Sequence, residues 1–555
     1  MSLSGSRVGS SSWKESLALF SVSVFRMKHG LRLLLLSGAL SVSACGPAET
    51  ALPLEEGAEG AGESPLATKA PFELNNALLP FDMPARADLA TSEYKVFAHW
   101  HNFPLRSYGS SSGQYYDNYT NWLKPTGTYA SIGGWLRDRP VPLLAVPAVE
   151  TDYGKRDMKT DIQTAAAVGV DGFLFNLWFR PTDNRWKWLT DLFNAADEFN
   201  TENPSAPFHV IPNIDSHILS TGSGANEPRL RADDLATFKN RASWRKLNGK
   251  FVVGSFRPEA LPASWYQAFF DQLKTVHGMD AVLWGTLLDP SEANRNALKP
   301  FMVGATFSRW DNLPYTSTPL NGITTLKTWG DQNGVPYSPP VSHTDNRPTG
   351  SITTETTGFT TQYKTWKAAI DSGVKMVQIL TWNDHYEGHA LRPNSAVQYA
   401  FYDLTAYYAT WFKTRKQPTL VRDVLYYSHR MHLSGEPYDT TKQPKPTASK
   451  NGVPLVDRVF VLGMLKSSGS VRITSGGTAY TADLAAGPQF FDAPLAVNNQ
   501  PSFQLSRNGT TVLQLTSAFR TRSPIVWQDL LYRAGSSSRP AVSGVQNNLP
   551  QDRLP

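Results

Sequence analysis

The segment Val170-Asp171-Gly172-Phe173-Leu174-Phe175-Asn176-Leu177-Trp178 indicates the fold of this chain. Its centre, Gly172–Leu177, is a short and mostly apolar run, typical of a strand that is buried on both faces of a parallel sheet. An amphipathic segment, Trp186–Phe199, follows it, and then a second such run, His209–Ile214. Strand, helix and strand in this order predict a βαβ unit with parallel strands.

The same alternation continues on both sides of this unit. The predicted strands are Tyr94–His99, Gly172–Leu177, His209–Ile214, Phe251–Ser255, Ala281–Thr286, Phe301–Thr306, Val335–Val341 and Met376–Thr381. Amphipathic segments between them include Arg156–Val168, Ala263–Val276 and Gln362–Ser372. Eight β/α units over roughly 300 residues predict a TIM barrel. The alternative is an open doubly wound sheet, but no G-x-G-x-x-G motif follows an early strand.

The pattern changes from about Leu420 to short alternating runs separated by turn residues. These runs are Val459–Leu465, Ser470–Thr474, Tyr480–Leu484, Phe503–Ser506 and Thr511–Leu515. Asn508-Gly509 between the last two is a strong signal for a type I′ hairpin. The sequence therefore predicts a small antiparallel β-sandwich after the barrel.

The N-terminus has the features of an export signal. A basic stretch, Met27–Arg32, precedes an uncharged run, Leu33–Ala44, which is too short to span a bilayer. The run ends in Val42-Ser43-Ala44-Cys45, which resembles a bacterial lipobox, so Cys45 is expected to carry lipid. The alternative is an ordinary secretory signal cleaved near Ala44. Met27 is a candidate for the true start.

These patterns predict five regions. They are a lipoprotein signal (1–45), a flexible tether rich in Pro, Ala, Glu and Gly (46–90), the barrel (91–418), the β-sandwich (419–533) and a loose tail (534–555). The expected location is the bacterial cell envelope, at the outer membrane or the cell surface, with the Cys45 lipid as the membrane contact.

Composition excludes several classes of protein. The 41% hydrophobic and 18% charged residues exclude a disordered chain for the bulk of the sequence. The net charge is +6, but residues 1–45 hold five basic residues and one acidic residue, which leaves +2 for the rest. No dense basic run remains for nucleic acid. The single cysteine excludes a disulfide or a cysteine-based metal site within the chain.

Active residues of a TIM barrel lie at the carboxyl ends of the strands. The most concentrated polar cluster follows the eighth predicted strand, Thr381-Trp382-Asn383-Asp384-His385-Tyr386-Glu387-Gly388-His389. Asp384 and Glu387 are the candidate catalytic acids. Candidate substrate-binding residues at the strand ends are His99, His101, Asn176, Trp178, Asp215, Trp310, His343, Trp382, Asn383 and His389.

Several of these residues have a structural alternative. His99 could be a core histidine, and Asp215 could cap the following helix. Trp178, Trp310 and Trp382 could fill the barrel, and at most two of them are expected to stack on sugar.

The 381–389 cluster resembles the T-W-N-D-Y-G-E-S-H segment of glycoside hydrolase family 71, the endo-α-1,3-glucanases. Further similarity is spread over about residues 94–530. It includes Val96–His99, Val170–Phe173, Pro212–Asp215, Asn248–Val253 and, less closely, Tyr337–Ser342. Two departures stand out. His385-Tyr386 replaces Tyr-Gly and Gly388 replaces Ser, and residues 103–150 look inserted beside the predicted cleft.

The resemblance implies an endo-acting hydrolase that cleaves α-1,3-glucan with inversion, through two carboxylates about 6.5–9.5 Å apart. Glu387 is assigned as the acid, by analogy with family 99, and Asp384 as the base. Glu387 would need a raised pKa to hold its proton. No cofactor or metal is expected, and the chain is expected to act as a monomer.

Two other functions stay open. Family 99, the endo-α-mannan hydrolases, has a similar W-N-E-x-x-E segment. A surface lipoprotein that binds polysaccharide without cleaving it is the other alternative, although such a protein has no need of both acids.

Overall fold

The computed structural model describes residues 78–101, 126–141, 153–222, 227–307 and 320–542. These residues belong to one compact unit that begins at Ala67. The signal segment, Cys45 and Trp310 lie outside the described residues. None of the helices within those ranges is long and apolar enough to cross a membrane.

Eight parallel strands form the central barrel. They are β1 (Lys95–Trp100), β2 (Gly172–Leu177), β3 (His209–Asp215), β5 (Lys250–Phe256), β6 (Ala281–Leu287), β7 (Met302–Phe307), β8 (Pro340–Val341) and β11 (Met376–Ile379). The sheet order is β7-β6-β5-β3-β2-β1-β11-β8, and the short strand β4 (Lys246–Leu247) pairs antiparallel with β5. A parallel bridge from Ala305 to Tyr337 joins β7 to the residues just before β8 and closes the ring. The predicted TIM barrel is confirmed.

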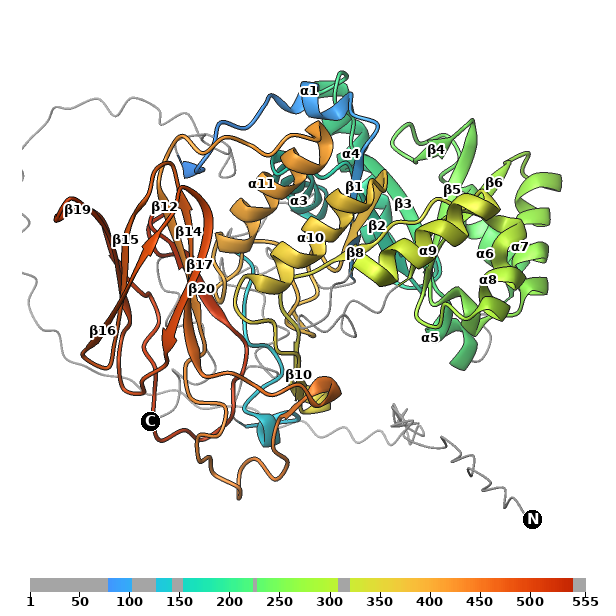
Figure 1. Ribbon diagram of the computed structural model, residues 1–555. Helices are drawn as coiled ribbons and strands as arrows, with labels where there is room; N and C mark the ends of the chain where they lie inside the picture. The colour runs from blue at the N-terminus through green and yellow to red at the C-terminus, as the bar shows by residue number, and fades with distance from the viewer. Residues whose placement is uncertain (1–77, 102–125, 142–152, 223–226, 308–319, 543–555) are drawn as a thin grey trace, which may run out of the picture. The chain divides into compact units, whose positions relative to one another are not determined.

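Helices follow most of the strands. They are α3 (Tyr153–Ala167), α4 (Trp186–Glu202), α5 (Ser216–Thr221), α6 (Pro228–Ala236), α7 (Ala263–Thr275), α8 (Glu292–Leu298), α9 (Leu320–Asn333), α10 (Thr360–Ser372) and α11 (Ala400–Thr414). A short helix, α1 (Arg86–Ala90), precedes β1. Figure 1 shows α3, α4, α10 and α11 gathered near β1 and β2.

The predicted strands agree with the observed ones to within a few residues, except for the seventh. Regular pairing there is limited to Pro340–Val341 rather than Val335–Val341. Pro336, Pro339 and Pro340 lack the N–H that a ladder needs, which accounts for the short strand.

Alternation along the strands divides the barrel interior into an apolar and a polar part. Phe97, Leu174, Ile211, Val252 and Trp284 form one buried cluster. Two residues further along their strands come His99, Asn176, Asn213, Gly254 and Thr286. Since residues i and i+2 of a strand face the same side, the interior becomes polar toward the carboxyl ends. The carboxyl end of the barrel therefore presents polar groups that suit a polar ligand.

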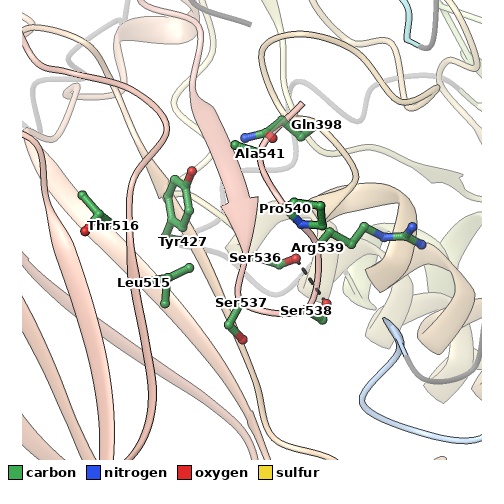
Figure 2. Close-up of a pocket in the computed structure, with 10 residues that line it drawn as sticks. All are labelled: Gln398, Tyr427, Leu515, Thr516, Ser536, Ser537, Ser538, Arg539, Pro540 and Ala541. Atoms are coloured by element: carbon green, nitrogen blue, oxygen red, sulfur yellow. Dashed lines mark hydrogen bonds between the residues drawn. The ribbon is translucent and has the colours of Figure 1, made fainter. Parts of the chain in front are cut away.

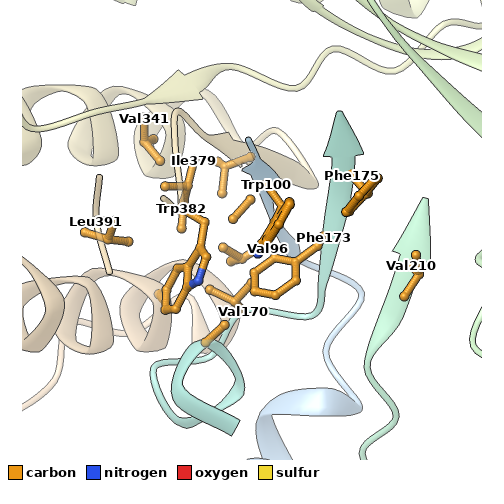
Figure 3. Close-up of a cluster of buried hydrophobic side chains, with 14 of the residues drawn as sticks. Val96, Trp100, Val170, Phe173, Phe175, Val210, Val341, Ile379, Trp382 and Leu391 are labelled. Carbon is orange, nitrogen blue, oxygen red and sulfur yellow. The ribbon is translucent and has the colours of Figure 1, made fainter. Parts of the chain in front are cut away.

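The main core lies between the strands and the helices. Val96, Trp100, Phe173 and Phe175 point into it from β1 and β2, and Trp382 packs against Phe173 with ring centroids 5.5 Å apart (Figure 3). Helix α11 is buried along nearly its whole length, from Ala400 to Lys413. A helix buried all round is typical of a contact between two packed layers.

Two antiparallel four-stranded sheets follow the barrel. Their orders are β17-β14-β12-β20 and β16-β15-β18-β19. The strands are β12 (Val424–His429), β14 (Arg458–Leu465), β15 (Gly469–Ser475), β16 (Thr478–Leu484), β17 (Gly487–Pro494), β18 (Ser502–Arg507), β19 (Thr510–Thr516) and β20 (Arg533–Ser536). Both sheets contribute to one apolar cluster, with Leu425 and Val461 from one and Ile473 and Phe503 from the other. The predicted β-sandwich is confirmed.

The predicted turn between β18 and β19 is also present. Asn508 has φ 49° and Gly509 has φ 77°, as a type I′ turn requires, and Arg507 pairs with Thr510 across it.

The structure differs from the predicted boundaries at both ends. Leu79 and Phe81 are fully buried, and Phe81 bridges Leu420, so the predicted tether ends before residue 79. Strand β20 and the Arg539–Asp403 ion pair show that the predicted loose tail is ordered up to at least that pair. The tether was predicted from the Pro-, Ala-, Glu- and Gly-rich residues near its start and was extended to residue 90, whereas the tail was predicted from the Ser-rich residues after Ala534.

A third, small sheet connects the barrel to the sandwich. It consists of β9 (Asn346–Arg347), β10 (Ile352–Thr353) and β13 (Ala448–Ser449), in the order β13-β10-β9. Two of its strands come from the segment between β8 and α10, and the third from the segment between β12 and β14. Strand β9 lies beside the residues that follow β11, and the Asn346 N–H donates to the Glu387 carbonyl at 2.9 Å.

Candidate active site

The polar cluster follows β11 at the carboxyl end of the barrel. The Asp384 N–H donates to the Thr381 hydroxyl at 2.9 Å. Oδ1 of Asp384 accepts the backbone N–H groups of Tyr386 and Glu387, both at 3.1 Å. These bonds fold residues 381–387 into a tight turn, which brings the two predicted acids to the same side although they are three residues apart.

Glu387 is held by two cationic side chains. Its Oε2 lies 3.0 Å from Nη1 of Arg347, on β9, and 3.0 Å from Nε2 of His389. The other side of the Arg347 guanidinium donates from Nε to Asp345 at 2.8 Å. The Glu387 side chain remains 39% exposed, whereas that of Asp384 is 5% exposed. Glu387 is thus the accessible acid and Asp384 the fixed one.

The charges around the pair decide where the proton rests. Burial on its own would raise the pKa of Glu387, but Arg347 and the hydrogen bond from His389 outweigh it and hold that pKa well below its usual range. Burial would lower the pKa of His389, but Glu387 and the nearby Asp384 raise it above its usual value. In the resting site the proton therefore lies on His389 and Glu387 is ionised, which is the opposite of the raised pKa that the sequence led us to expect.

The two acids are also closer than expected for inversion. Oxygens of Asp384 and Glu387 and a nitrogen of His389 lie within 4.8 Å of one another. An inverting pair leaves about 6.5–9.5 Å for the substrate and a water, whereas a retaining pair is about 5–5.5 Å apart. The resting site is therefore more contracted than the predicted mechanism requires.

This triad of ligand atoms is also of a kind that can hold a cation. Arg347 already places a guanidinium 3.0 Å from the same Glu387 oxygen. A divalent metal bound there would meet that fixed positive charge. The hydrogen bond from His389 and the contact with Arg347 satisfy Glu387 from within the chain.

Asn383 fixes the end of β1 against this turn. Its Oδ1 accepts the His101 N–H at 2.7 Å and its Nδ2 donates to the His101 carbonyl at 3.0 Å. Because both polar atoms are used on the backbone and the side chain is buried, Asn383 is a structural residue and not the predicted sugar contact. The His101 side chain, 26% exposed, points back to Asp384, with Nε2 4.0 Å from Oδ2.

Three other predicted residues lie in the polar part of the barrel interior. Asn176 donates to Asp215 at 3.1 Å, and Asp215 also accepts the Ile218 N–H, so it caps α5 as the structural alternative proposed. His99 lies edge-on to Phe256, and burial lowers its pKa to about 3, with a smaller effect from His101 and His389. His99 is therefore neutral. All three are buried at the bottom of the site.

Two residues that were predicted to bind sugar point away from the barrel interior. Trp382 is fully buried in the core between the strands and the helices, against Phe173. His343 is buried as well. Its Nε2 donates to the Ala390 carbonyl at 3.1 Å, and its ring packs on Phe401. Both were selected because they follow a strand, but successive residues of an extended chain face opposite sides, and these two point outward.

Trp178 remains a candidate for stacking on sugar. It is half-buried at the end of β2, with its ring centroid 6.2 Å from that of His101. Among the described residues, the candidates that meet around the cluster are thus Asp384, Glu387, His389, His101 and Trp178. His99, Asn176 and Asp215 lie beneath them.

Sequence reasoning missed Arg347, Asp345 and Asp138. Arg347 and Asp345 contact the cluster from a stretch 40 residues earlier in the chain, and Asp138 pairs with His385 at 2.9 Å, both side chains being buried. No motif marks any of them. The only available signal was position, since residues 103–150 were expected beside the cleft, and residues 126–141 do contact the 381–398 segment.

Two cavities in the described part of the chain lie elsewhere. One, of about 370 Å³, lies between β20 and β19 and is lined by residues such as Gln398, Tyr427 and Ser538 (Figure 2). The other, of about 760 Å³, is lined by Lys95, Lys250 and Met376, at the first residues of their strands. It therefore opens at the end of the barrel opposite to Asp384. Neither contains the carboxylate pair.

Comparison with known proteins points to one family. The model of glycosyl hydrolase family 71 matches residues 146–526. An ascus wall endo-1,3-alpha-glucanase of Schizosaccharomyces pombe is 26% identical over 428 residues, which cover 69% of this chain and 93% of the relative. A mutanase of Penicillium rubens is 24% identical over 403 residues, covering 65% of this chain and 80% of the relative.

Among solved structures, an endo-alpha-mannosidase of family 99 from Bacteroides thetaiotaomicron matches 57% of this chain and 97% of its own. Its TM-score is 0.45 at 14% sequence identity.

Proposed function

The chain belongs to glycosyl hydrolase family 71, and from that membership we propose that it cleaves α-1,3-glucosidic bonds within a polysaccharide, with Asp384 and Glu387 as the catalytic acids. One observation carries the assignment of the site. Two carboxylates lie at the carboxyl end of the barrel, within 4.8 Å of each other and of His389, and one of them is accessible. The names of the fungal relatives support α-1,3-glucan as the substrate.

The proton for the leaving oxygen starts on His389. Its Nε2 passes the proton to Oε2 of Glu387, 3.0 Å away, and the carboxyl group then protonates the glycosidic oxygen. Asp384, fixed by two backbone N–H groups, takes a proton from the water that attacks the anomeric carbon. That proton returns from Asp384 to His389, whose Nε2 lies 3.6 Å from Oδ2, and the cycle closes.

Inversion requires the two acids to separate when the substrate binds. Asp384 cannot move without breaking its turn, whereas Glu387 is held, among the described residues, through side-chain contacts with Arg347 and His389. We infer that the protonated Glu387 loses its attraction to Arg347 and turns toward the substrate. This rotation opens the gap of about 6.5–9.5 Å that an attacking water needs.

Separate Asp384→Asn and Glu387→Gln variants test the assignment on insoluble α-1,3-glucan. Each should lower kcat by about 100- to 10,000-fold while the protein still binds the glucan, because each removes one proton-transfer step. Asp371→Asn, on the exposed face of α10, is the matched control and should leave kcat unchanged. NMR of the first products should show the β-anomer.

Each other outcome has a distinct meaning. Turnover close to wild type in either variant would exclude that residue as a catalytic acid, and an initial α-anomer would exclude inversion. Cleavage of α-mannan instead of α-1,3-glucan would favour the family 99 type of activity. Binding of α-1,3-glucan by the wild type without any cleavage would favour a capture protein.

We also propose that the mature protein is anchored to the cell envelope through lipid on Cys45. The proposal is supported by the basic stretch, the short apolar run and the position of the single cysteine at the end of Val42-Ser43-Ala44-Cys45. Mass spectrometry of the mature N-terminus should find a diacylglyceryl-modified Cys45 as residue one. A mature chain with a free Cys45 thiol would contradict it.

A further inference from the structure

Residues 126–141 pack against residues 381–395, which hold the two catalytic acids and which we call the catalytic segment. Residues 126–141 lie outside the match to the family model, which begins at residue 146. Asp138 pairs with the buried His385 at 2.9 Å. The backbone of Arg139 exchanges two hydrogen bonds with Ser395, and the Val141 N–H donates to the Pro393 carbonyl at 2.9 Å. These contacts fix the segment against residues 385–395.

The same segment adds two aromatic rings, those of Trp135 and Tyr129, next to Tyr386. Nε1 of Trp135 donates to the Tyr386 carbonyl at 3.1 Å, and the two ring centroids are 4.7 Å apart. Tyr129 also packs on Trp135, with ring centroids 4.9 Å apart. Two of the three positions at which residues 381–389 depart from the family pattern, His385 and Tyr386, therefore contact this segment through Asp138 and Trp135.

From Tyr386 the rings continue across the site. The centroid of Tyr386 lies 6.0 Å from that of His101, which lies 6.2 Å from that of Trp178. We call Tyr129, Trp135, Tyr386, His101 and Trp178 the aromatic row. It passes the catalytic acids at His101, whose Nε2 is 4.0 Å from Asp384.

We propose that the aromatic row is an extended binding surface for a neutral glucan chain, and that residues 126–141 add subsites to the cleft on one side of the catalytic acids. The proposal deepens the proposed function and rests on it for the identity of the glucan.

The burial and chemistry of the row support this ligand. Each of its five residues is partly exposed, whereas Trp100 and Trp382 nearby are fully buried in the core. Aromatic rings offer flat apolar faces, and Tyr and Trp add a hydrogen-bonding group at the edge, which together suit the apolar face and the hydroxyl groups of a sugar. No member of the row is an acid or a permanent cation, so it matches an uncharged chain.

Tyr129 provides the sharpest test, since its ring packs on Trp135 and no contact between described residues joins it to either acid. In a Glu387→Gln background, the additional change Tyr129→Ala should weaken retention on insoluble α-1,3-glucan by about three- to tenfold. In the active enzyme, Tyr129→Ala should raise KM for the polymer by a similar factor. It should leave kcat on a short soluble α-1,3-oligosaccharide within about twofold of wild type, because the reacting atoms are untouched.

Two matched variants complete the design. Tyr129→Phe keeps the ring face without the hydroxyl and should retain most of the binding that Tyr129→Ala loses. Trp329→Ala removes a half-buried tryptophan from α9 that stacks on Arg295, and it should change neither KM nor retention.

Equal retention and equal KM for Tyr129→Ala and wild type would contradict the proposal that the aromatic row binds the glucan chain. An equal loss on the polymer and on the short oligosaccharide would also overturn it, because the residue would then act through the catalytic segment. Absence of α-1,3-glucan cleavage by the wild type would instead overturn the proposed function, and the retention comparison would still decide the row.

Discussion

At the scale of single residues, Arg347 controls the charge of the site. Its guanidinium lies 3.0 Å from Glu387 and lowers the pKa of this acid more than any other neighbouring group does. It also faces His389 across the shared Oε2 atom of Glu387. A fixed positive charge at this point favours the ionised carboxylate and disfavours the imidazolium.

The Arg347→Ala variant should therefore move the pH profile of kcat/KM in one direction. Without the guanidinium, the protonated forms of both Glu387 and His389 become more favourable, so both pKa values rise. The alkaline limb of the profile, which reports loss of the His389 proton, should shift to higher pH by about one unit. Initial rates on soluble α-1,3-oligosaccharide between pH 4 and 9 measure it.

Arg241→Ala removes a guanidinium that pairs with Asp197 on α4, and it serves as the control with an unchanged profile. A lowered kcat at every pH without a shift of either limb would contradict the electrostatic role of Arg347. The sign of the shift separates this role from simple loss of structure, which moves neither limb.

The barrel strands could be predicted from the sequence because each is a continuous apolar run, and this pattern depends only on burial on both faces. The direction of side chains just beyond a strand could not. The eighth strand was expected to reach Thr381 but ends at Ile379, and the turn that follows sends Trp382 into the core and Asp384 into the cleft. Arg347 and Asp138 were missed because contacts between distant segments leave no periodic trace in the sequence.

At the scale of elements, the small β13-β10-β9 sheet connects the sandwich to the catalytic acids. Lys450 directly follows β13, and its Nζ lies 3.5 Å from Oδ2 of Asp345. Asp345 accepts from Arg347 at 2.8 Å, and Arg347 contacts Glu387. The sandwich therefore reaches the accessible acid through three consecutive charged contacts.

The close approach of β9 also explains one departure from the family pattern. Gly388 has φ +60°, and a Cβ atom there would lie 2.8 Å from the Asn346 carbonyl oxygen. A side chain at 388 would push β9 away and move Arg347 with it. Glycine at this position keeps Arg347 within reach of Glu387.

Lys450→Met should lower kcat on α-1,3-glucan by about two- to tenfold with little change in KM. Without the ammonium group, Asp345 attracts Arg347 more strongly and draws it away from Glu387. Lys450→Arg restores the charge and should recover most of the activity. Steady-state kinetics on the three proteins measures the effect.

Lys445→Met is the matched control, since Lys445 lies in the same segment and its ammonium group donates to the Gly350 carbonyl at 3.4 Å, with no described contact to Asp345 or Arg347. Equal kinetics for Lys450→Met and wild type would show that Asp345 holds Arg347 without help from the sandwich.

At the scale of the whole molecule, the barrel and the sandwich share buried charges and apolar surface. Asp403 of α11 binds Arg539, and the Ala534 N–H of β20 donates to the Ala396 carbonyl. Glu355, between β10 and α10, accepts from Nη2 of Arg430 at 2.9 Å, and both side chains are 1% exposed. A buried junction of this kind couples the folding of its two sides.

Glu355→Ala should destabilise the protein by about 3–5 kcal/mol, because it leaves the Arg430 charge buried without its partner. Glu355 also accepts the Val456 N–H at 3.0 Å and a hydrogen bond from Tyr532, so its loss disturbs both the segment before β14 and the segment before β20. Urea unfolding followed by tryptophan fluorescence measures the free energy of unfolding, and wild type should show one transition for barrel and sandwich together.

The Glu355→Leu/Arg430→Met double variant removes both charges and should recover a large part of the loss, since an apolar pair of similar volume avoids the burial of an unpaired ion. Lys367→Ala breaks an exposed pair with Asp371 on α10 and should cost less than about 0.5 kcal/mol. Two separate transitions in the wild type, or a loss in Glu355→Ala as small as that in Lys367→Ala, would mean that the sandwich folds independently of the barrel and that Glu355–Arg430 does not join them.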